Sequence, residues 1–195
     1  KTPKLKTVPL PSGLPAPVER FYKTVYGDEI PVIETVVIKG RGDISPFGLK
    51  LPARFLFVHN AGKGYRHYFE ATWFGMPFMK VNERYLDGKS LFELPVGDPI
   101  VDDASTNQAA NLAVWAEAAW FPSIWITDPR VHWEAVDEQT ALLFVPYRDR
   151  EENFVMRFNP DTGLLDSMET MRFRDSGDQA KKILWITRNI AGKKI

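Results

Sequence analysis

The sequence predicts a mainly β, α+β fold: a strongly curved antiparallel sheet, or half-barrel, packed on a central helix. Short apolar segments with alternating or β-branched residues are separated by turns rich in Gly, Pro, Asn and Asp. One stretch, residues 103–120, has the apolar period of a helix instead. The turn positions also place most aromatic residues of 54–94 on one face of the sheet, which is typical of an antiparallel sheet with one covered side.

The composition excludes several classes of partner and chemistry. Lys and Arg total 25, and Asp and Glu also total 25, so the formal net charge is zero. A chain without net charge has no long-range field that would attract nucleic acid, and we expect no nucleic-acid partner. The sequence has no cysteine, which excludes disulfides and thiolate chemistry. No apolar run is long enough to cross a bilayer as a helix.

The N-terminal end differs in composition from the rest of the chain. Residues 1–14 carry several prolines among lysines and small residues, which predicts an extended tether. Residues 15–195 are expected to form a single β-rich domain. The first residue is Lys1 rather than Met, so we expect that a segment upstream of it has been removed. We expect membrane association through that segment, and a membrane-anchored or extracytoplasmic location over a cytoplasmic one.

Local patterns predict the order of helices and strands. A helix should begin near Pro17 and stop at Gly27. Strands should then fill residues 30–94, interrupted by tight loops and turns at Gly, Pro, Asn and Asp. A second series of strands is expected after the central helix, at 131–136, 140–147, 153–158, 164–174 and 183–190.

The first hairpin of the early series has a register that can be tested from its side chains. If residues 60–64 form the loop, Phe57 lies opposite His67 and Arg54 lies opposite Glu70. An opposite-charge pair across two strands is stabilising, so the second pairing supports this register.

The next hairpin extends the same face. Taking residues 75–77 as its loop places Trp73 opposite Met79 and His67 opposite Tyr85. The face that results is expected to carry Phe55, Phe57, His59, Tyr65, His67, Phe69, Trp73, Met79, Val81, Tyr85, Phe92 and Leu94. The opposite, wet face is expected to carry Arg54, Arg66, Glu70, Thr72, Lys80, Asn82, Arg84 and Glu93.

The central helix is expected to start at a cap formed by Asp103 or Ser105 and to end before Pro122. We expect Trp120 of this helix and Trp133 of the following strand to be buried where the helix meets the sheet. The apolar helix face comprises Leu112, Trp115, Ala116, Ala119 and Trp120.

Two further expectations concern the second half of the chain. Glu117 lies among apolar neighbours in the helix, so its carboxylate needs a partner, for which Arg130 is the candidate. In the hairpin after the helix, one side should carry Val131, Trp133, Ala135, Leu142 and Phe144.

Several short segments resemble a bacterial family of unknown function. The opening Leu14-Pro15-Ala16-Pro17-Val18 is similar to that family's L-P-x-P-V pattern. Residues 116–122 and 131–133 are similar to its A-E-x-x-x-x-P and V-x-W patterns. The resemblance implies a curved antiparallel sheet around helices, similar to the lipoprotein carriers LolA and LolB, which bind acyl chains. It carries no established activity and no catalytic residue.

A binding function follows from the aromatic face. One helix is narrow beside a sheet of many strands, so we expect a cavity for an apolar small molecule or acyl chain between helix and sheet. The residues expected to contact this ligand are Phe55, Phe57, His59, His67, Phe69, Trp73, Met79, Tyr85, Trp115 and Glu117. No cofactor is expected.

Two alternatives stay open. The aromatic face could bind a protein partner as an interaction module. The protein could also be a hydrolase or metalloenzyme that uses His59, His67 and Glu83, since two imidazoles and a carboxylate can hold a metal. The sequence lacks close-spaced metal ligands on a helix and lacks the nucleophile and phosphate-binding motifs. We therefore expect no metal and no catalytic residues.

Overall fold

The computed structural model describes residues 5–45, 48–93 and 97–189. These residues form three sheets with antiparallel strands and one long central helix, which confirms the predicted mainly β fold class. Leu94 and Ile190, both assigned to strands above, lie outside the described residues. Within the described part of the chain, no helix is both long enough and apolar enough to span a membrane.

The chain forms two compact units. That the two units belong to the single domain predicted for residues 15–195 stays a prediction. The first unit takes its described residues from 1–33, 115–172 and 182–195, and the second takes them from 34–114 and 173–181.

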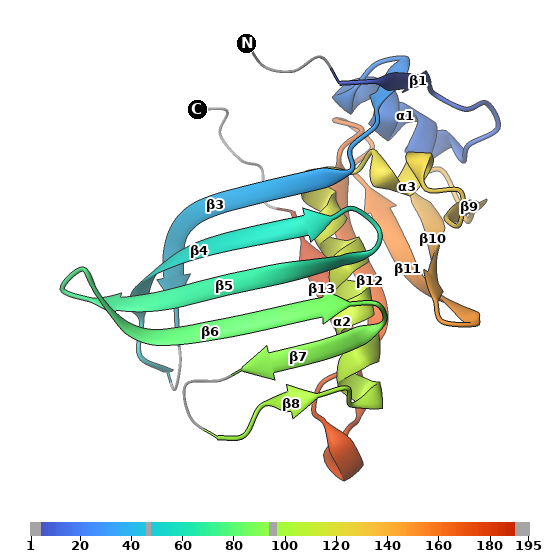
Figure 1. Cartoon of the computed structure of the whole chain (residues 1–195). Coiled ribbons are helices and arrows are strands. Elements are labelled where there is room, and N and C mark those ends of the chain that lie inside the picture. Colours follow the sequence, from blue (N-terminus) through green and yellow to red (C-terminus); the bar gives the residue numbers. More distant parts are fainter. Residues whose placement is uncertain (1–4, 46–47, 94–96, 190–195) are drawn as a thin grey trace. The chain divides into compact units, whose positions relative to one another are not determined.

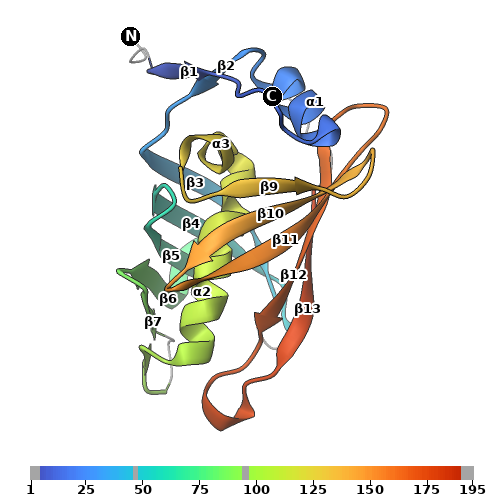
Figure 2. The same ribbon diagram turned by 90° about the vertical axis from the view of Figure 1, so that its right-hand side faces the viewer.

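The first unit contains a five-stranded sheet of order β13-β12-β11-β10-β9 and a two-stranded sheet, β1-β2 (Figure 2). Part of the segment 1–14, predicted as an extended tether, therefore pairs as strand β1. The strands are β1 (Thr7–Pro9), β2 (Glu29–Pro31), β9 (His132–Ala135), β10 (Thr140–Tyr147), β11 (Arg150–Phe158), β12 (Leu165–Phe173) and β13 (Lys182–Arg188). The helices are α1 (Ala16–Val25), the 3-10 helix η2 (Glu117–Trp120) and α3 (Ile124–Thr127).

The second unit is a six-stranded sheet in which each strand pairs with the next one in sequence (Figure 1). Helix α2 (Ala104–Ala116) packs on one face of this sheet through its residues up to 114. The strands are β3 (Thr35–Ile44), β4 (Leu51–Asn60), β5 (Gly64–Trp73), β6 (Met76–Leu86), β7 (Lys89–Glu93) and β8 (Ile100–Val101), and a short 3-10 helix, η3 (Gly177–Gln179), completes the unit.

Helix α1 has the boundaries that its sequence predicts. Pro17 lies in the first turn, where its missing N–H costs no intrahelical hydrogen bond. Phe21 and Tyr22 are buried, and the Tyr22 hydroxyl donates a hydrogen bond of 2.7 Å to the carbonyl of Pro122. The helix ends before Gly27, which has a positive φ of 79°.

The register of β4 and β5 is the predicted one. Phe57 lies opposite His67, and Arg54 lies opposite Glu70. The Arg54 guanidinium forms an ion pair with the Glu70 carboxylate at 2.5 Å. The loop at residues 60–64 therefore fixes which side chains of this hairpin face α2.

The predicted register of β5 and β6 is wrong by two residues up to Ala71 and by three at the turn, because the pairing shifts between Ala71 and Thr72. Thr72, predicted on the wet face, is buried. His67 lies opposite Glu83 rather than Tyr85, and Trp73 lies opposite Met76 rather than Met79. The turn is shorter than predicted because it consists of residues 74–75, which both have positive φ.

The predicted face of the hairpin β9–β10 is also wrong. Trp133 lies opposite Leu143, not on the side of Leu142 and Phe144. Leu143 and Val145 are fully buried, whereas Leu142 and Phe144 are half-buried. The run of apolar residues in β10 makes both of its faces apolar, so alternation does not indicate which face is covered.

The two tryptophans predicted to be buried at the end of the central helix are not the ones that fill the core. Trp120 is 58% exposed, and Trp133 is half-buried. Trp115 and Trp125 are each only 1% exposed, and the Trp125 indole N–H donates a hydrogen bond of 3.1 Å to the Trp115 carbonyl. The reason lies in the backbone, because α2 ends at Ala116 and the chain continues as a 3-10 helix. Four residues of 3-10 helix turn about 80° further than four residues of α-helix, which carries Trp120 away from the apolar face.

Asp103 caps α2, as predicted. Its Oδ1 accepts hydrogen bonds from the Thr106 backbone N–H at 2.9 Å and from the Ser105 hydroxyl, and its Oδ2 accepts one from the Gly177 N–H at 3.2 Å. These hydrogen bonds, first of all the one from Ser105, lower the pKa of Asp103 to about 2.

Replacing Asp103 by Ala is expected to lower the free energy of unfolding by about 1 kcal/mol at neutral pH, because the first turn of α2 loses its cap. The carboxyl has a lower pKa in the folded state, so its contribution is present above its ordinary pKa of 3.8 and is lost as the pH falls towards about 2. Urea unfolding of both proteins at several pH values tests this. A difference in stability that is unchanged at about pH 2 would contradict the prediction.

Candidate functional site

The aromatic face of the second unit is a packed surface. The Phe57 ring centroid lies 4.1 Å from that of His67 and 4.7 Å from that of Phe69. Tyr65 stacks on His67 with the ring centroids 3.9 Å apart and the rings 11° from parallel. The Tyr85 hydroxyl donates a hydrogen bond of 3.3 Å to Asn111 of α2. Phe57, His67 and Tyr85, which were predicted to contact a ligand, are buried in this face.

A polar group lies within this packed face. The Tyr65 hydroxyl donates a short hydrogen bond to Oε1 of Glu83, whose Oε2 is 3.9 Å from Nδ1 of His67. His67 and Tyr65 are buried, and Glu83 retains partial contact with solvent. The carboxylate thus holds the tyrosine and lies beside the imidazole, an arrangement that orients all three side chains.

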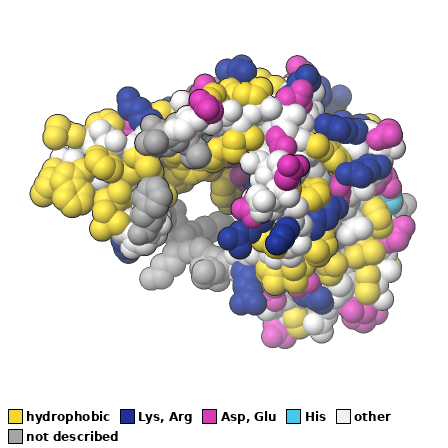
Figure 3. Space-filling view, turned by 90° about the horizontal axis from the view of Figure 1, so that it is seen from below, with side chains coloured by type: hydrophobic (Ala, Val, Ile, Leu, Met, Phe, Trp, Pro, Cys, Tyr) yellow, Lys and Arg dark blue, Asp and Glu magenta, His cyan; other side chains and the backbone are white. Residues whose placement is uncertain are grey.

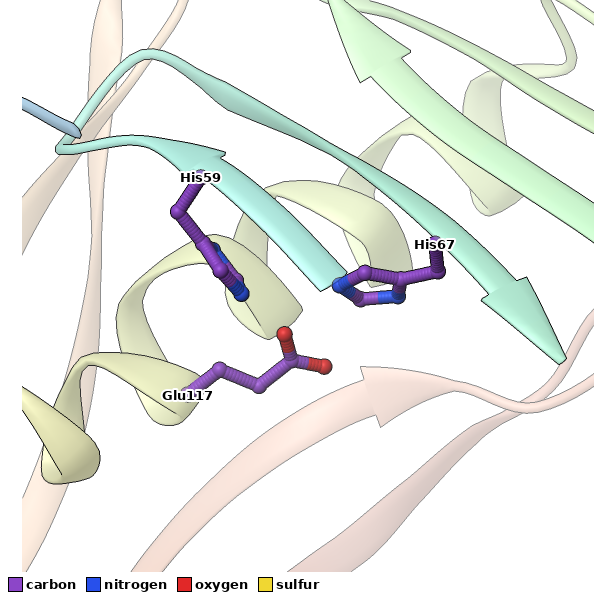
Figure 4. A group of neighbouring side chains, drawn as sticks. All are labelled: His59, His67 and Glu117. Carbon is purple, nitrogen blue, oxygen red and sulfur yellow. The ribbon is translucent and has the colours of Figure 1, made fainter. Parts of the chain in front are cut away.

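His59 and His67 are the histidines of the second unit that could hold a metal. They lie on the neighbouring strands β4 and β5, with their ring centroids 5.4 Å apart (Figure 4). Their ligating nitrogens approach to within 4.8 Å. A catalytic zinc site needs three protein ligands, so these two imidazoles supply only part of one. A metalloenzyme that uses both histidines and Glu83 stays a hypothesis.

The remaining predicted residues of the sheet differ in their surroundings. Phe55 and Phe69 are half-buried, and Phe55 packs against Phe57 with the ring centroids 4.9 Å apart. Met79 is half-buried, whereas Trp73 is 52% exposed near the end of the β5–β6 hairpin. Trp73 is therefore not part of the packed face, and its contact with a ligand stays a prediction.

Two of the predicted residues, Trp115 and Glu117, belong to the first unit. Trp115 is buried, and its ring lies 6.0 Å from the Arg130 guanidinium carbon. Glu117, also drawn in Figure 4, is half-buried and is the first residue of η2. Arg130, the predicted partner of Glu117, forms an ion pair with Asp128 at 2.5 Å.

A hollow of about 530 Å³ lies in the second unit, and the outward-facing side chains that line it belong to the face of the sheet opposite α2. Its apolar lining comes from Leu56, Val58 and Leu91, which are all half-buried. The volume is in the range that small-molecule sites commonly have. The polar part of the lining includes Arg66, Tyr68, Asn82, Arg84 and Glu93.

Arg66 and Arg84 give this hollow its chemical character. They lie directly opposite each other on β5 and β6, and both are exposed. Like charges in this position repel each other. Across residues 5–45, 48–93 and 97–189, no ion pair joins either guanidinium to a carboxylate. Two adjacent guanidinium groups can together bind a carboxylate or phosphate through parallel hydrogen bonds.

Glu70, an acidic residue of β5 on the same face as Arg66, is held by other partners. The Tyr68 hydroxyl donates a hydrogen bond of 2.6 Å to Glu70, which raises the pKa of Tyr68 and lowers that of Glu70. Glu70 is thereby held by Tyr68 and by Arg54.

Alternation along the strands predicts Arg66 and Arg84 on the wet face but does not predict a binding site there. The feature that could have indicated a site is the cross-strand pair of arginines. Two arginines opposite each other are unfavourable in a sheet unless a further group offsets the repulsion. The predicted register of β5 and β6 did not pair the two arginines, because it was shifted by two residues at this position.

A second hollow, of about 450 Å³, lies in the first unit. Its lining includes Phe21, Tyr26, Trp120 and Leu164, with Asn159 and Thr162 at the turn between β11 and β12. Among the residues that the structure describes, none of those lining it is Arg, Lys or His. It offers apolar contacts without a cation that could fix an acidic group.

Comparison with known proteins identifies one family. A family of unknown function, DUF6544, matches residues 4–195. No curated protein matches, and no solved structure matches.

Proposed function

The chain belongs to the DUF6544 family of unknown function, which supplies no activity, and we propose that the protein binds an anionic amphiphile in the hollow opposite α2. The ligand class is a single acyl-like chain that ends in a carboxylate or phosphate. The observation that carries the proposal is the pair of arginines, Arg66 and Arg84, beside the apolar side chains of the same sheet face. A likeness to the acyl-chain carriers LolA and LolB, which the family resemblance in the sequence implies, would favour the same class of ligand.

The apolar lining suits a hydrocarbon chain. Leu56 and Val58 are half-buried on β4, and Leu91 is half-buried on β7, where it lies opposite Arg84. Each methylene moved from water into apolar contact contributes about 0.8 kcal/mol when it is fully buried. A hydrocarbon chain that covers these side chains would gain affinity without a deep cavity between helix and sheet. The ligand site on the aromatic face stays a prediction.

The acidic end of the ligand explains why two arginines are tolerated opposite each other. A carboxylate between them would accept hydrogen bonds from both guanidinium groups and would remove their mutual repulsion. The free protein would then be less stable than it would be with one arginine neutralised, by roughly 0.2–1 kcal/mol. A binding site that costs stability in this way is typical of functional positions.

We expect dodecanoate to bind, and dodecanol to bind more weakly by about tenfold or more, because the alcohol lacks the charge. Arg66→Gln and Arg84→Gln should each weaken dodecanoate binding by about tenfold and leave dodecanol binding unchanged, since a hydrogen bond to a charged group contributes about 1.5–3 kcal/mol. Isothermal titration calorimetry below the micelle concentration measures both ligands.

Arg54→Gln is the matched control, because Arg54 lies on the same sheet face but is paired with Glu70. It should leave the affinity for dodecanoate unchanged. Equal affinity for the acid and the alcohol, or an equal loss of dodecanoate binding in the control and in Arg66→Gln, would rule out the proposed site.

A further inference from the structure

The end of the β5–β6 hairpin exposes four large apolar side chains. Trp73 is 52% exposed, Phe74 90%, Met76 68% and Phe78 71%. We call these four residues the hairpin tip. Hydrophobic side chains are seen gathered at this end of the second unit (Figure 3). Single exposed apolar residues need no explanation, but a contiguous group on a projecting turn marks an interaction site.

The turn and the bulge of the hairpin backbone expose these side chains to solvent. Phe74 and Gly75 form the two-residue loop, with φ values of 47° and 80°. Asn and Gly are the usual residues in such a loop, and a bulky residue with positive φ is an outlier. The pairing shifts between Ala71 and Thr72, and Phe78 is the residue left without a partner in the register. Such bulges redirect side chains at functional sites.

A row of charged side chains crosses the sheet behind the hairpin tip. Arg41, Arg54, Glu70 and Lys80 occupy successive strands at the same level, as the register pairs Arg41 with Arg54, Arg54 with Glu70, and Glu70 with Lys80. Only Glu70 is acidic, so the row carries a net charge of plus two. Phe74 follows Glu70 by four positions, which corresponds to about 13 Å along an extended strand.

The apolar hairpin tip and the positively charged row behind it together suit the interface of an anionic lipid bilayer. Trp, Phe and Leu are common on the apolar face of peripheral membrane-binding segments, and this face enters the boundary between headgroups and acyl chains to a depth of about 5–10 Å. At about 13 Å from the end of the hairpin, the charged row would then lie at the level of the phosphates. Its net positive charge complements anionic headgroups.

We propose that the hairpin tip is a membrane-contact site that inserts into the interface of an anionic lipid bilayer. Trp73, Phe74, Met76 and Phe78 enter the interface, and Arg41, Arg54 and Lys80 lie against the headgroups. The proposal does not depend on the ligand of the hollow, because the two sites use different residues.

Co-sedimentation of the full chain with large vesicles tests the proposal. One set of vesicles contains phosphatidylcholine alone, and in the other about a third of the lipid is phosphatidylglycerol. We expect the protein to pellet with the anionic vesicles and to bind them more tightly, by about fivefold or more, than the neutral ones. Tryptophan emission should shift to shorter wavelength on binding, and Trp73→Phe should reduce that shift.

The double variant Phe74→Asn, Phe78→Ser is expected to lose binding by about tenfold or more, because it removes the two most exposed rings of the hairpin tip. Asn accepts the positive φ at position 74, so the turn keeps its conformation. Lys80→Gln should weaken binding to anionic vesicles by about fivefold and leave binding to neutral vesicles unchanged. Leu184→Ser is the matched control, since Leu184 is 56% exposed on a different sheet, and it should change nothing.

Three results would overturn the proposal. The first is no pelleting with either kind of vesicle, and the second is unchanged binding by the double variant. The third is a dimer in light scattering that the double variant converts to a monomer without any effect of lipid, which would make the hairpin tip a self-association surface instead.

Discussion

Replacing Trp125 by Ala is expected to lower the free energy of unfolding by about 3–5 kcal/mol, as truncation of large buried aromatics does. The Trp125 ring is only 1% exposed and packs edge-on against Trp133, with the ring centroids 6.3 Å apart. The substitution would leave a cavity and would also leave the Trp115 carbonyl without the hydrogen bond that the Trp125 indole donates. Urea unfolding, followed by circular dichroism, measures the change.

The matched control for this substitution is Trp120→Ala, four residues after Ala116 and in the same unit. Trp120 is 58% exposed, so its truncation should change the free energy of unfolding by less than about 1 kcal/mol. If Trp120→Ala destabilises the protein more than Trp125→Ala does, the position of the 3-10 helix η2 is wrong.

Replacing Gly64 by Ala is expected to lower the free energy of unfolding by about 3 kcal/mol, at the upper end of the usual cost of overpacking. A Cβ atom at this position would lie 2.2 Å from the carbonyl oxygen of Tyr85 on the neighbouring strand β6. The backbone of β5 fixes the position of the Cβ, and the carbonyl belongs to the backbone of β6, so neither can move away without disturbing the hydrogen-bonded ladder. Thermal and urea unfolding of the variant measure the loss.

Gly42→Ala controls for the general effect of adding a methyl group to this sheet. Nothing lies within 4 Å of a Cβ at Gly42, which is an exposed residue of β3. Ala restricts the unfolded chain more than Gly does, so this variant should be as stable as the parent or up to about 1 kcal/mol more stable. A similar loss at both glycines would mean that strand propensity, and not the contact with Tyr85, causes the effect.

The register of the hairpin β4–β5 could be predicted from sequence because two independent signals agree. The loop at residues 60–64 sets the pairing, and the pair of Arg54 and Glu70 confirms it by charge. At the next turn only one signal was available. The rules for turn residues point to Gly75 and Pro77, whereas the chain turns at Phe74 and Gly75, and Pro77 is accommodated within β6 beside a bulge.

The sequence predicted on which face the residues of the candidate site lie, but not that they lie next to one another. Arg66 and Arg84 were assigned to the wet face from alternation, and alternation is unaffected by a shift of two residues. That they lie opposite each other, beside Leu56 and Leu91, depends on the pairing of β5 and β6. The aromatic face was predicted correctly as a face, but the sequence pattern does not tell how completely its rings fill the space beneath α2.

By itself, the sequence determined the mainly β fold, the faces of the first strands, the start of α1 and the cap at Asp103. Each of these follows from short-range chemistry: side chains alternate, turns need particular residues, and helix ends need hydrogen-bond partners. Only the tertiary structure decided that Trp125 is buried and Trp120 is exposed, that the hairpin tip is uncovered, and that a hollow lies beside Arg66. The physical reason is that burial depends on which element packs against a surface, and residues far apart in the chain decide that.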